Sequence, residues 1–166
     1  MTMPPKPCLL VVDDEPEVCN SVYHLLHRTY EILRAHSAAE AVALMEQHDV
    51  QIIMTDQRMP DVTGVEMLTR LKPSYPEAVR ILFTGFADIN SVIAAINQGH
   101  VFRYLSKPWQ PEELEAVVAD ALAEYNRIVQ HTRELAECRQ TNAQLKADLH
   151  AVQTELARLN RENPPK

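Results

Sequence analysis

Two hydrophobic periods alternate along the first 110 residues of this chain. Short continuous apolar runs, typical of buried strands, cover residues 8–12, 30–35, 50–55, 79–84 and 101–105. Apolar positions at helical spacing fall between these runs, over residues 18–26, 38–47, 64–71 and 88–97. A last helix begins near Pro111. Strands that alternate with helices predict an α/β domain with a parallel sheet covered on both faces.

Polar and charged residues follow most of the predicted strands. Asp13 and Asp14 come after the first, Asp56 after the third, Thr84 at the end of the fourth and Lys107 after the fifth. Ligands of such sheets bind outside the carboxyl ends of the strands, so we expect these side chains on one edge. Three neighbouring carboxylates repel one another unless a cation joins them. Oxygen ligands alone favour Mg²⁺.

The same edge has groups that suit a phosphate. A lysine ammonium pairs with phosphate as a point charge, and a threonine hydroxyl donates to a phosphate oxygen. One carboxylate can then act as a nucleophile and form an acyl phosphate. Each residue also has a structural alternative: Asp14 as a helix cap, Asp56 or Lys107 in a turn, Thr84 as a strand end. Their joint occurrence at several strand ends favours a functional site.

Four stretches carry a resemblance to a known family: VVDDEPEV at 11–18, IIMTDQRMPDVTGVEML at 52–68, ILFTG at 81–85 and YLSKPW at 104–109. Over residues 6–125 the chain resembles the receiver domain of two-component response regulators. The resemblance implies a doubly wound, flavodoxin-like sheet of five parallel strands in the order 2-1-3-4-5. It also implies a protein that is not an enzyme beyond its own phosphotransfer and dephosphorylation.

The resemblance implies a role for each matching residue. Asp56 is the phosphoacceptor, and Thr84 and Lys107 bind the phosphoryl oxygens. The Mg²⁺ ligands are Asp14, Asp56, the backbone carbonyl of Arg58 and, mostly through water, Asp13. Tyr104 matches an aromatic switch coupled to Thr84, and Gly85 leaves room for the phosphoryl group. The Lys107–Pro108 bond is expected to be cis.

Two positions depart from the commonest receiver pattern. Arg58 and Phe86 flank the mouth of the expected site, and we hypothesise that they restrict water and lengthen the phosphorylated lifetime. The alternative is that Arg58 points to solvent. The segments DQRMP and RYLSKPW also resemble those of receivers joined to hydrogenase-type transcription activators, HD-type phosphodiesterases or sensor kinases.

A long helix is predicted after residue 111, because no proline interrupts the chain until Pro164. In its second part, apolar residues recur at alternating spacings of three and four, which is typical of a coiled coil. Asn142 at an a position favours a parallel, in-register dimer. The alternative is a solvated single helix. The predicted seam is Leu135, Cys138, Asn142, Leu145, Leu149, Val152, Leu156 and Leu159.

The predicted organisation is a receiver over residues 1–125, a coiled-coil helix over 126–163 and a tail at 164–166. Charge is distributed unevenly along the chain. Residues 1–125 have nine basic and eighteen acidic residues, whereas residues 126–166 have seven basic and five acidic residues. An acidic domain without a recognition helix argues against direct nucleic-acid binding.

Three cysteines without a CxxC pair and no signal peptide or membrane-spanning run favour a cytoplasmic protein. The expected partners are a histidine kinase, a second copy of the chain and an unidentified output. The output is expected in a larger response regulator of which this chain is a fragment.

Overall fold

The computed structural model describes residues 5–85, 93, 96 and 101–162. The chain divides into two compact units, Met1–Arg127 and Ile128–Lys166, and each is described by itself. The helix predicted over residues 88–97 lies almost wholly outside the described residues. Phe86 lies outside them as well.

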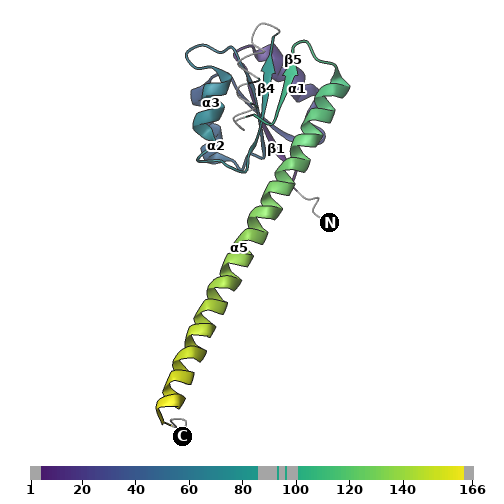
Figure 1. Ribbon diagram of the computed structural model, residues 1–166. Coiled ribbons are helices and arrows are strands. Elements are labelled where there is room, and N and C mark those ends of the chain that lie inside the picture. Colours follow the sequence, from purple (N-terminus) through teal and green to yellow (C-terminus); the bar gives the residue numbers. More distant parts are fainter. Residues whose placement is uncertain (1–4, 86–92, 94–95, 97–100, 163–166) are drawn as a thin grey trace. The chain divides into compact units, whose positions relative to one another are not determined.

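The first unit is built on a five-stranded parallel sheet (Figure 1). The strand order is β2-β1-β3-β4-β5, which confirms the predicted topology. Because every strand runs in the same direction, the residues that follow them lie at one edge of the sheet. The strands are β1 (Cys8–Val12), β2 (Glu31–Ala35), β3 (Ile52–Asp56), β4 (Val79–Thr84) and β5 (Arg103–Ser106).

Burial explains why the apolar runs form the central strands. Every residue of β1 and β3 is buried, as expected where helices cover both faces of a sheet. Helices α2 (Ala38–Gln47) and α3 (Gly64–Leu71) pack on one face, and α1 (Pro16–Leu26) lies on the other (Figure 1). The first turns of α5 (Pro111–Glu162) also contribute to the core, through Leu114, Val118 and Ala121.

The helix starts follow local capping chemistry. Ser37 accepts a hydrogen bond from the Glu40 backbone, but the Glu40 carboxylate accepts from the His36 N–H instead of closing a full capping box. Helix α3 has the complete box, between Thr63 and Glu66. Helix α1 has no side-chain cap and begins at a proline, so the alternative that Asp14 serves as its cap does not hold.

Three strands differ from their predicted bounds because neighbouring residues are buried without joining the ladder. The N–H of Tyr30 bonds to Leu26 at the end of α1, so β2 begins one residue later than predicted. Val50 is buried before β3. Val101 is also buried, but pairing with β4 begins only at Arg103 opposite Ile81. The hydrophobic pattern predicted which residues are buried. A buried residue belongs to a strand only where it also pairs with a neighbouring strand.

Helix α5 continues without interruption to Glu162, as the absence of proline predicted. In the second unit, the apolar residues of the predicted seam are exposed within the single chain. Their exposed fractions run from 45% to 64% for Leu135, Leu145, Leu149, Val152, Leu156 and Leu159. Among the described helices, none is both long enough and apolar enough to cross a membrane.

Candidate functional site

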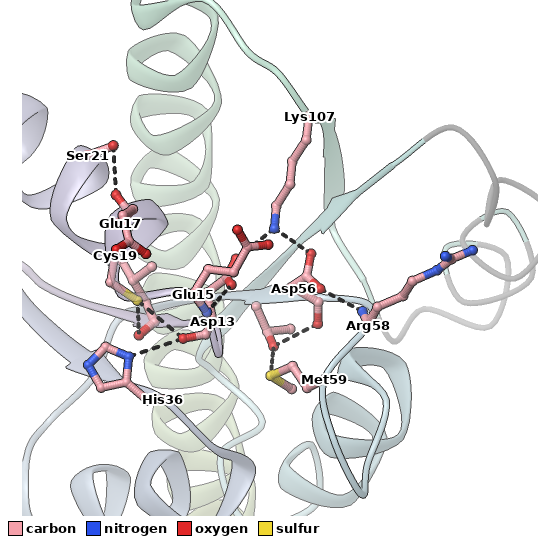
Figure 2. Close-up of polar contacts among 12 residues, drawn as sticks. Asp13, Glu15, Glu17, Cys19, Ser21, His36, Asp56, Arg58, Met59 and Lys107 are labelled. Carbon is pink, nitrogen blue, oxygen red and sulfur yellow. Dashed lines mark hydrogen bonds and ion pairs between the residues drawn. The ribbon is translucent and has the colours of Figure 1, made fainter.

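Two carboxylates and one ammonium meet at the carboxyl edge of the sheet (Figure 2). Asp13 directly follows β1, Asp56 is the last residue of β3, and Lys107 directly follows β5. The Lys107 Nζ lies 2.7 Å from an oxygen of Asp13 and 2.7 Å from an oxygen of Asp56. The sheet therefore brings together three of the five strand-end groups that the sequence placed on one edge.

Asp13 is fully buried, and each of its polar atoms has a partner. Its N–H donates to the Ala35 carbonyl at the end of β2. One carboxylate oxygen accepts from the Glu15 N–H at 2.9 Å, and the other accepts from Lys107. These contacts fix the carboxylate between the start of α1 and the lysine.

Asp56 is held in a similar way but is more open. Its side chain is 10% exposed, and one oxygen accepts from the Arg58 N–H at 2.7 Å. This side-chain-to-backbone hydrogen bond is typical of a turn, the structural alternative for Asp56. It is formed together with the ion pair to Lys107. The hydroxyl of Thr55 donates to the Asp56 carbonyl at 3.1 Å, so both ends of the residue are oriented.

Burial and charge perturb the pKa values of this cluster. Burial raises the pKa of Asp13, and the hydrogen bond from Lys107 offsets only part of that rise. For Lys107, burial lowers the pKa, but the hydrogen bonds and charges of Asp13 and Asp56 outweigh it and raise the pKa. The lysine therefore stays protonated and partly neutralises two carboxylates that are nearly removed from water.

The remaining predicted site residues are not part of this contact. Asp14 is exposed to solvent. Thr84 is buried, and its hydroxyl donates to the Gly85 carbonyl at 2.9 Å. Tyr104 is 46% exposed, which places its ring outside the core. Among the residues that the structure describes, no atom lies within 4 Å of a Cβ built on Gly85, in agreement with the space that the resemblance implied beside Thr84.

Arg58 presents its backbone and its side chain in different directions. Its N–H bonds to Asp56, while its exposed side chain extends away from the Asp56 carboxylate (Figure 2). The hypothesis that Arg58 shields the site from water therefore gains no support from this conformation.

The predicted Mg²⁺ ligands do not form a preassembled cluster. Within the described part of the chain, no group of three or more His, Cys, Asp or Glu side chains is arranged to hold a metal ion. The donor chemistry nevertheless fits a divalent cation. Asp13 and Asp56 carry two negative charges against the single charge of Lys107, and Asp14 adds another at the same strand end.

Aromatic packing beside the lysine is a feature that sequence reasoning missed. The Lys107–Pro108 bond is cis, as predicted. The ring of Trp109 stacks on Phe83, with centroids 4.8 Å apart, and the Lys107 Nζ lies 5.8 Å from the Phe83 centroid. The only sequence signal was the proximity of Trp109 to Lys107. The single tryptophan of the chain is therefore a natural fluorescent reporter of this site.

A close approach between Gly64 and the end of β3 was also not predicted from the sequence. A Cβ added to Gly64 would collide with the carbonyl oxygen of Asp56 and crowd Leu82. Two hydrogen bonds join the start of α3 to Gln57, the residue after Asp56. The Gly64 N–H donates to the Gln57 carbonyl, and the Val65 N–H donates to the Gln57 side-chain oxygen. Helix α3 thus packs directly against the backbone that carries Asp56.

Comparison with known proteins agrees with this geometry. Residues 9–119 match the family described as the response regulator receiver domain. The chain belongs to this family. The sheet order is thus that of a receiver domain, a signalling module of two-component systems.

Two of its relatives are transcriptional regulatory proteins. The chain is 39% identical over 114 residues to the hydrogenase transcriptional regulatory protein HoxA of Cupriavidus necator, covering 69% of this chain and 24% of that protein. It is 30% identical over 115 residues to the transcriptional regulatory protein GlrR of Escherichia coli, covering 69% and 26%. The chain thus spans about a quarter of the length of these relatives.

Solved structures show the same fold. The signal receiver domain of an HD domain-containing protein from Pseudomonas fluorescens has a TM-score of 0.72 and 30% identity, covering 78% of this chain and 96% of that one. A structure described as adenylate cyclase from Rhodopirellula baltica has a TM-score of 0.76 and 29% identity, covering 78% and 97%. Hydrogenase regulators and HD-domain proteins are among the groups that the DQRMP and RYLSKPW segments resemble.

Proposed function

We propose that this receiver domain is a phosphorylation switch whose acceptor is Asp56. A carboxylate oxygen of Asp56 bonds to phosphorus while the bond between phosphorus and a histidine nitrogen of a partner kinase breaks. Positioning and charge neutralisation provide most of the catalysis of such a transfer. The observation that carries the proposal is the Lys107 ammonium, 2.7 Å from both Asp56 and the buried Asp13.

The residues around Asp56 have different roles in the proposed transfer. The ion pair with Lys107 and the hydrogen bond from the Arg58 N–H orient the acceptor. Once the acceptor carries a phosphoryl group, Lys107 can follow the new negative charge, since its side chain is 22% exposed and has room to move. The Thr84 hydroxyl must give up the Gly85 carbonyl to donate to a phosphoryl oxygen.

Mg²⁺ is the cofactor that fits this edge. Asp14, Asp56 and the backbone carbonyl of Arg58 would hold it, with Asp13 as an outer ligand. Bound there, the ion would neutralise negative charge on the acceptor and the incoming phosphoryl oxygens. The uncompensated negative charge and the exposure of Asp14 support this assignment.

The switch would pass from the acceptor to Tyr104. Movement of Thr84 toward the phosphoryl group would open space behind it, next to Gly85, where a Cβ would meet no described residue within 4 Å. The exposed Tyr104 ring could then turn inward and change the surface formed by β5 and the first turns of α5. In a structure of the protein with a phosphoryl mimic bound at Asp56, burial of the Tyr104 ring would be the sign of this step.

The phosphotransfer proposal has a direct test. Intact mass is measured after incubation with acetyl phosphate and Mg²⁺, for the wild type, Asp56→Ala and the control Asp49→Ala at the opposite edge of the sheet. We expect one phosphoryl group on the wild type and the control and none on Asp56→Ala. An unmodified wild type, or a modified Asp56→Ala, would contradict the proposal.

The exposed seam of α5 supports a second proposal, a parallel homodimer through residues 128–162. Six large apolar side chains at heptad spacing lie about half exposed in the single chain, which is unfavourable unless another surface covers them. Pairing of a and d positions with a second copy would bury them. Asn142 at an a position would select the parallel, in-register arrangement.

Cys138 makes the register testable. It is exposed, whereas Cys8 and Cys19 are buried. In a parallel pair, two Cys138 side chains would face each other at a d position, so mild oxidation should give a disulfide-linked dimer. The matched control carries Cys138→Ser with Gln140→Cys, which moves the thiol to an outward position and should cross-link poorly. Equal cross-linking of both proteins, or a monomer in sedimentation equilibrium, would contradict the dimer.

A further inference from the structure

The backbone carbonyl of Asp13 accepts hydrogen bonds from two side chains that lie behind the acidic site (Figure 2). The Cys19 Sγ from α1 lies 3.7 Å from this oxygen, and the His36 Nδ1 from the loop after β2 lies 3.2 Å from it. Neither residue contacts Asp56 or Lys107 among the described interactions. Both act on the backbone of an acid whose side chain is in the site.

Each donor has the hydrogen that this contact requires. A carbonyl oxygen can only accept, so the Nδ1 of His36 must carry its hydrogen when it bonds to Asp13. Burial raises the pKa of Cys19 to about 11, so its thiol keeps its proton at neutral pH. Of the three carbonyls near the Cys19 sulfur, that of Asp13 is the closest.

The position of this carbonyl gives the contact its significance. It belongs to the peptide group that joins Asp13 to Asp14. The direction of the carbonyl therefore defines the orientation of the peptide plane that links the two residues. The Asp13 N–H is separately fixed by Ala35. Asp14, by contrast, is exposed, and its carboxylate has no hydrogen bond or ion pair with another described residue. This peptide leads directly into the Asp14 Cα, so a change in its direction can change where the exposed Asp14 side chain points.

We propose that His36 is a positioning residue that holds the Asp13–Asp14 peptide, with Cys19 as its buried counterpart, in the orientation that presents Asp14 to a divalent cation. This inference rests on the proposed Mg²⁺-dependent function. His36 suits such a role because its side chain is exposed at the surface and its backbone N–H is independently bonded to Glu40. Substitution of the imidazole should therefore leave helix α2 in place.

The test compares His36→Leu with His36→Asn. Asparagine places an N–H donor on the same atom of the side chain that carries Nδ1 in histidine, whereas leucine has no donor. Mg²⁺ affinity is measured from Trp109 fluorescence. The amide resonance of Asp14 is followed by NMR in the Mg²⁺-free protein. His48→Leu, exposed at the end of α2, is the control.

We expect His36→Leu to bind Mg²⁺ about tenfold more weakly, the size of effect found when residues that orient metal ligands are removed. His36→Asn and His48→Leu should stay within about twofold of the wild type on the same scale. The Asp14 amide should shift in His36→Leu and return in His36→Asn. Equal affinities for all variants, or no rescue by asparagine, would overturn the inference while the wild type still binds Mg²⁺. A wild type that does not bind Mg²⁺ would instead overturn the proposed function together with it.

Discussion

Replacement of Lys107 by methionine removes the one positive charge that joins Asp13 and Asp56, while the aliphatic stem keeps its packing. In the absence of Mg²⁺ this leaves a fully buried carboxylate and a 10% exposed one facing each other without their shared cation. We therefore expect Lys107→Met to destabilise the receiver domain when the cation site is kept empty with a chelator.

The structure sets the size of this effect. Breaking a buried ion pair by removing one partner typically costs about 3–5 kcal/mol, because a buried charge is left uncompensated. The Lys107 side chain is 22% exposed, so water already screens part of the interaction. This places the expected loss at the lower end, about 3 kcal/mol.

Urea unfolding followed by Trp109 fluorescence measures this loss. The single tryptophan belongs to the receiver domain, so its signal is specific for that unit. With a slope of about 1–3 kcal/mol per molar urea, a loss of about 3 kcal/mol lowers the midpoint by roughly 1–3 M. Lys6→Met is the matched control, because the exposed Lys6 ammonium bonds to one backbone carbonyl and to neither acid.

The pH dependence has a definite sign. The pKa of Lys107 is raised in the folded state, so deprotonation of the lysine removes its stabilisation only at alkaline pH, as the pH rises from the unfolded pKa of about 10.4 through the folded pKa. Burial raises the pKa of Asp13 above 3.8, so ionisation of this residue lowers stability as the pH rises through its folded pKa. The penalty of Lys107→Met should therefore be small at acidic pH and grow toward neutrality.

A second substitution separates this explanation from lost packing. Asp13→Asn removes one of the two charges that need Lys107, so the double variant should recover most of the stability lost in Lys107→Met. If Lys107→Met costs no more than Lys6→Met, or if the double variant is the sum of the two single losses, the electrostatic account of this site is wrong.

Three further predictions concern the receiver domain. Gly64→Ala should destabilise it by about 3 kcal/mol in urea unfolding, because the new Cβ would collide with the Asp56 carbonyl. Thr63→Ala should cost about 1 kcal/mol in the same assay, because the capping box of α3 is lost. In native Cys138→Ser, neither Cys8 nor Cys19 should react with iodoacetamide at pH 8, since both are buried and burial raises each pKa to about 11.

Matched controls make these predictions specific. Gly85→Ala should leave stability nearly unchanged, because its Cβ would meet no atom of the described residues within 4 Å. Thr69→Ala lies in the interior of α3, where its hydroxyl only bonds back to Val65, and should cost less than Thr63→Ala. Equal losses within either pair would count against the collision or the cap. Rapid alkylation of native Cys138→Ser would show that burial does not protect the remaining thiols.

Hydrophobic period and strand-end chemistry determined most of the fold in advance. The apolar runs at β1 and β3 predicted strands buried on both faces, and helices that join parallel strands provide that burial. Because parallel strands end at one edge, the residues that follow them had to gather there. The absence of proline between Pro111 and Pro164 likewise favoured a helix α5 that continues to Glu162.

Tertiary packing decided which of these groups meet. Asp13 and Asp14 are adjacent and chemically alike, yet one is fully buried against Lys107 and the other is exposed. The Asp13 carbonyl is bonded by His36, which the sequence places 23 positions away. Sequence pattern specifies the face or edge a residue occupies, because that follows from local backbone geometry. The direction of its side chain depends on atoms from distant elements, and these are assembled only when the sheet and helices pack together.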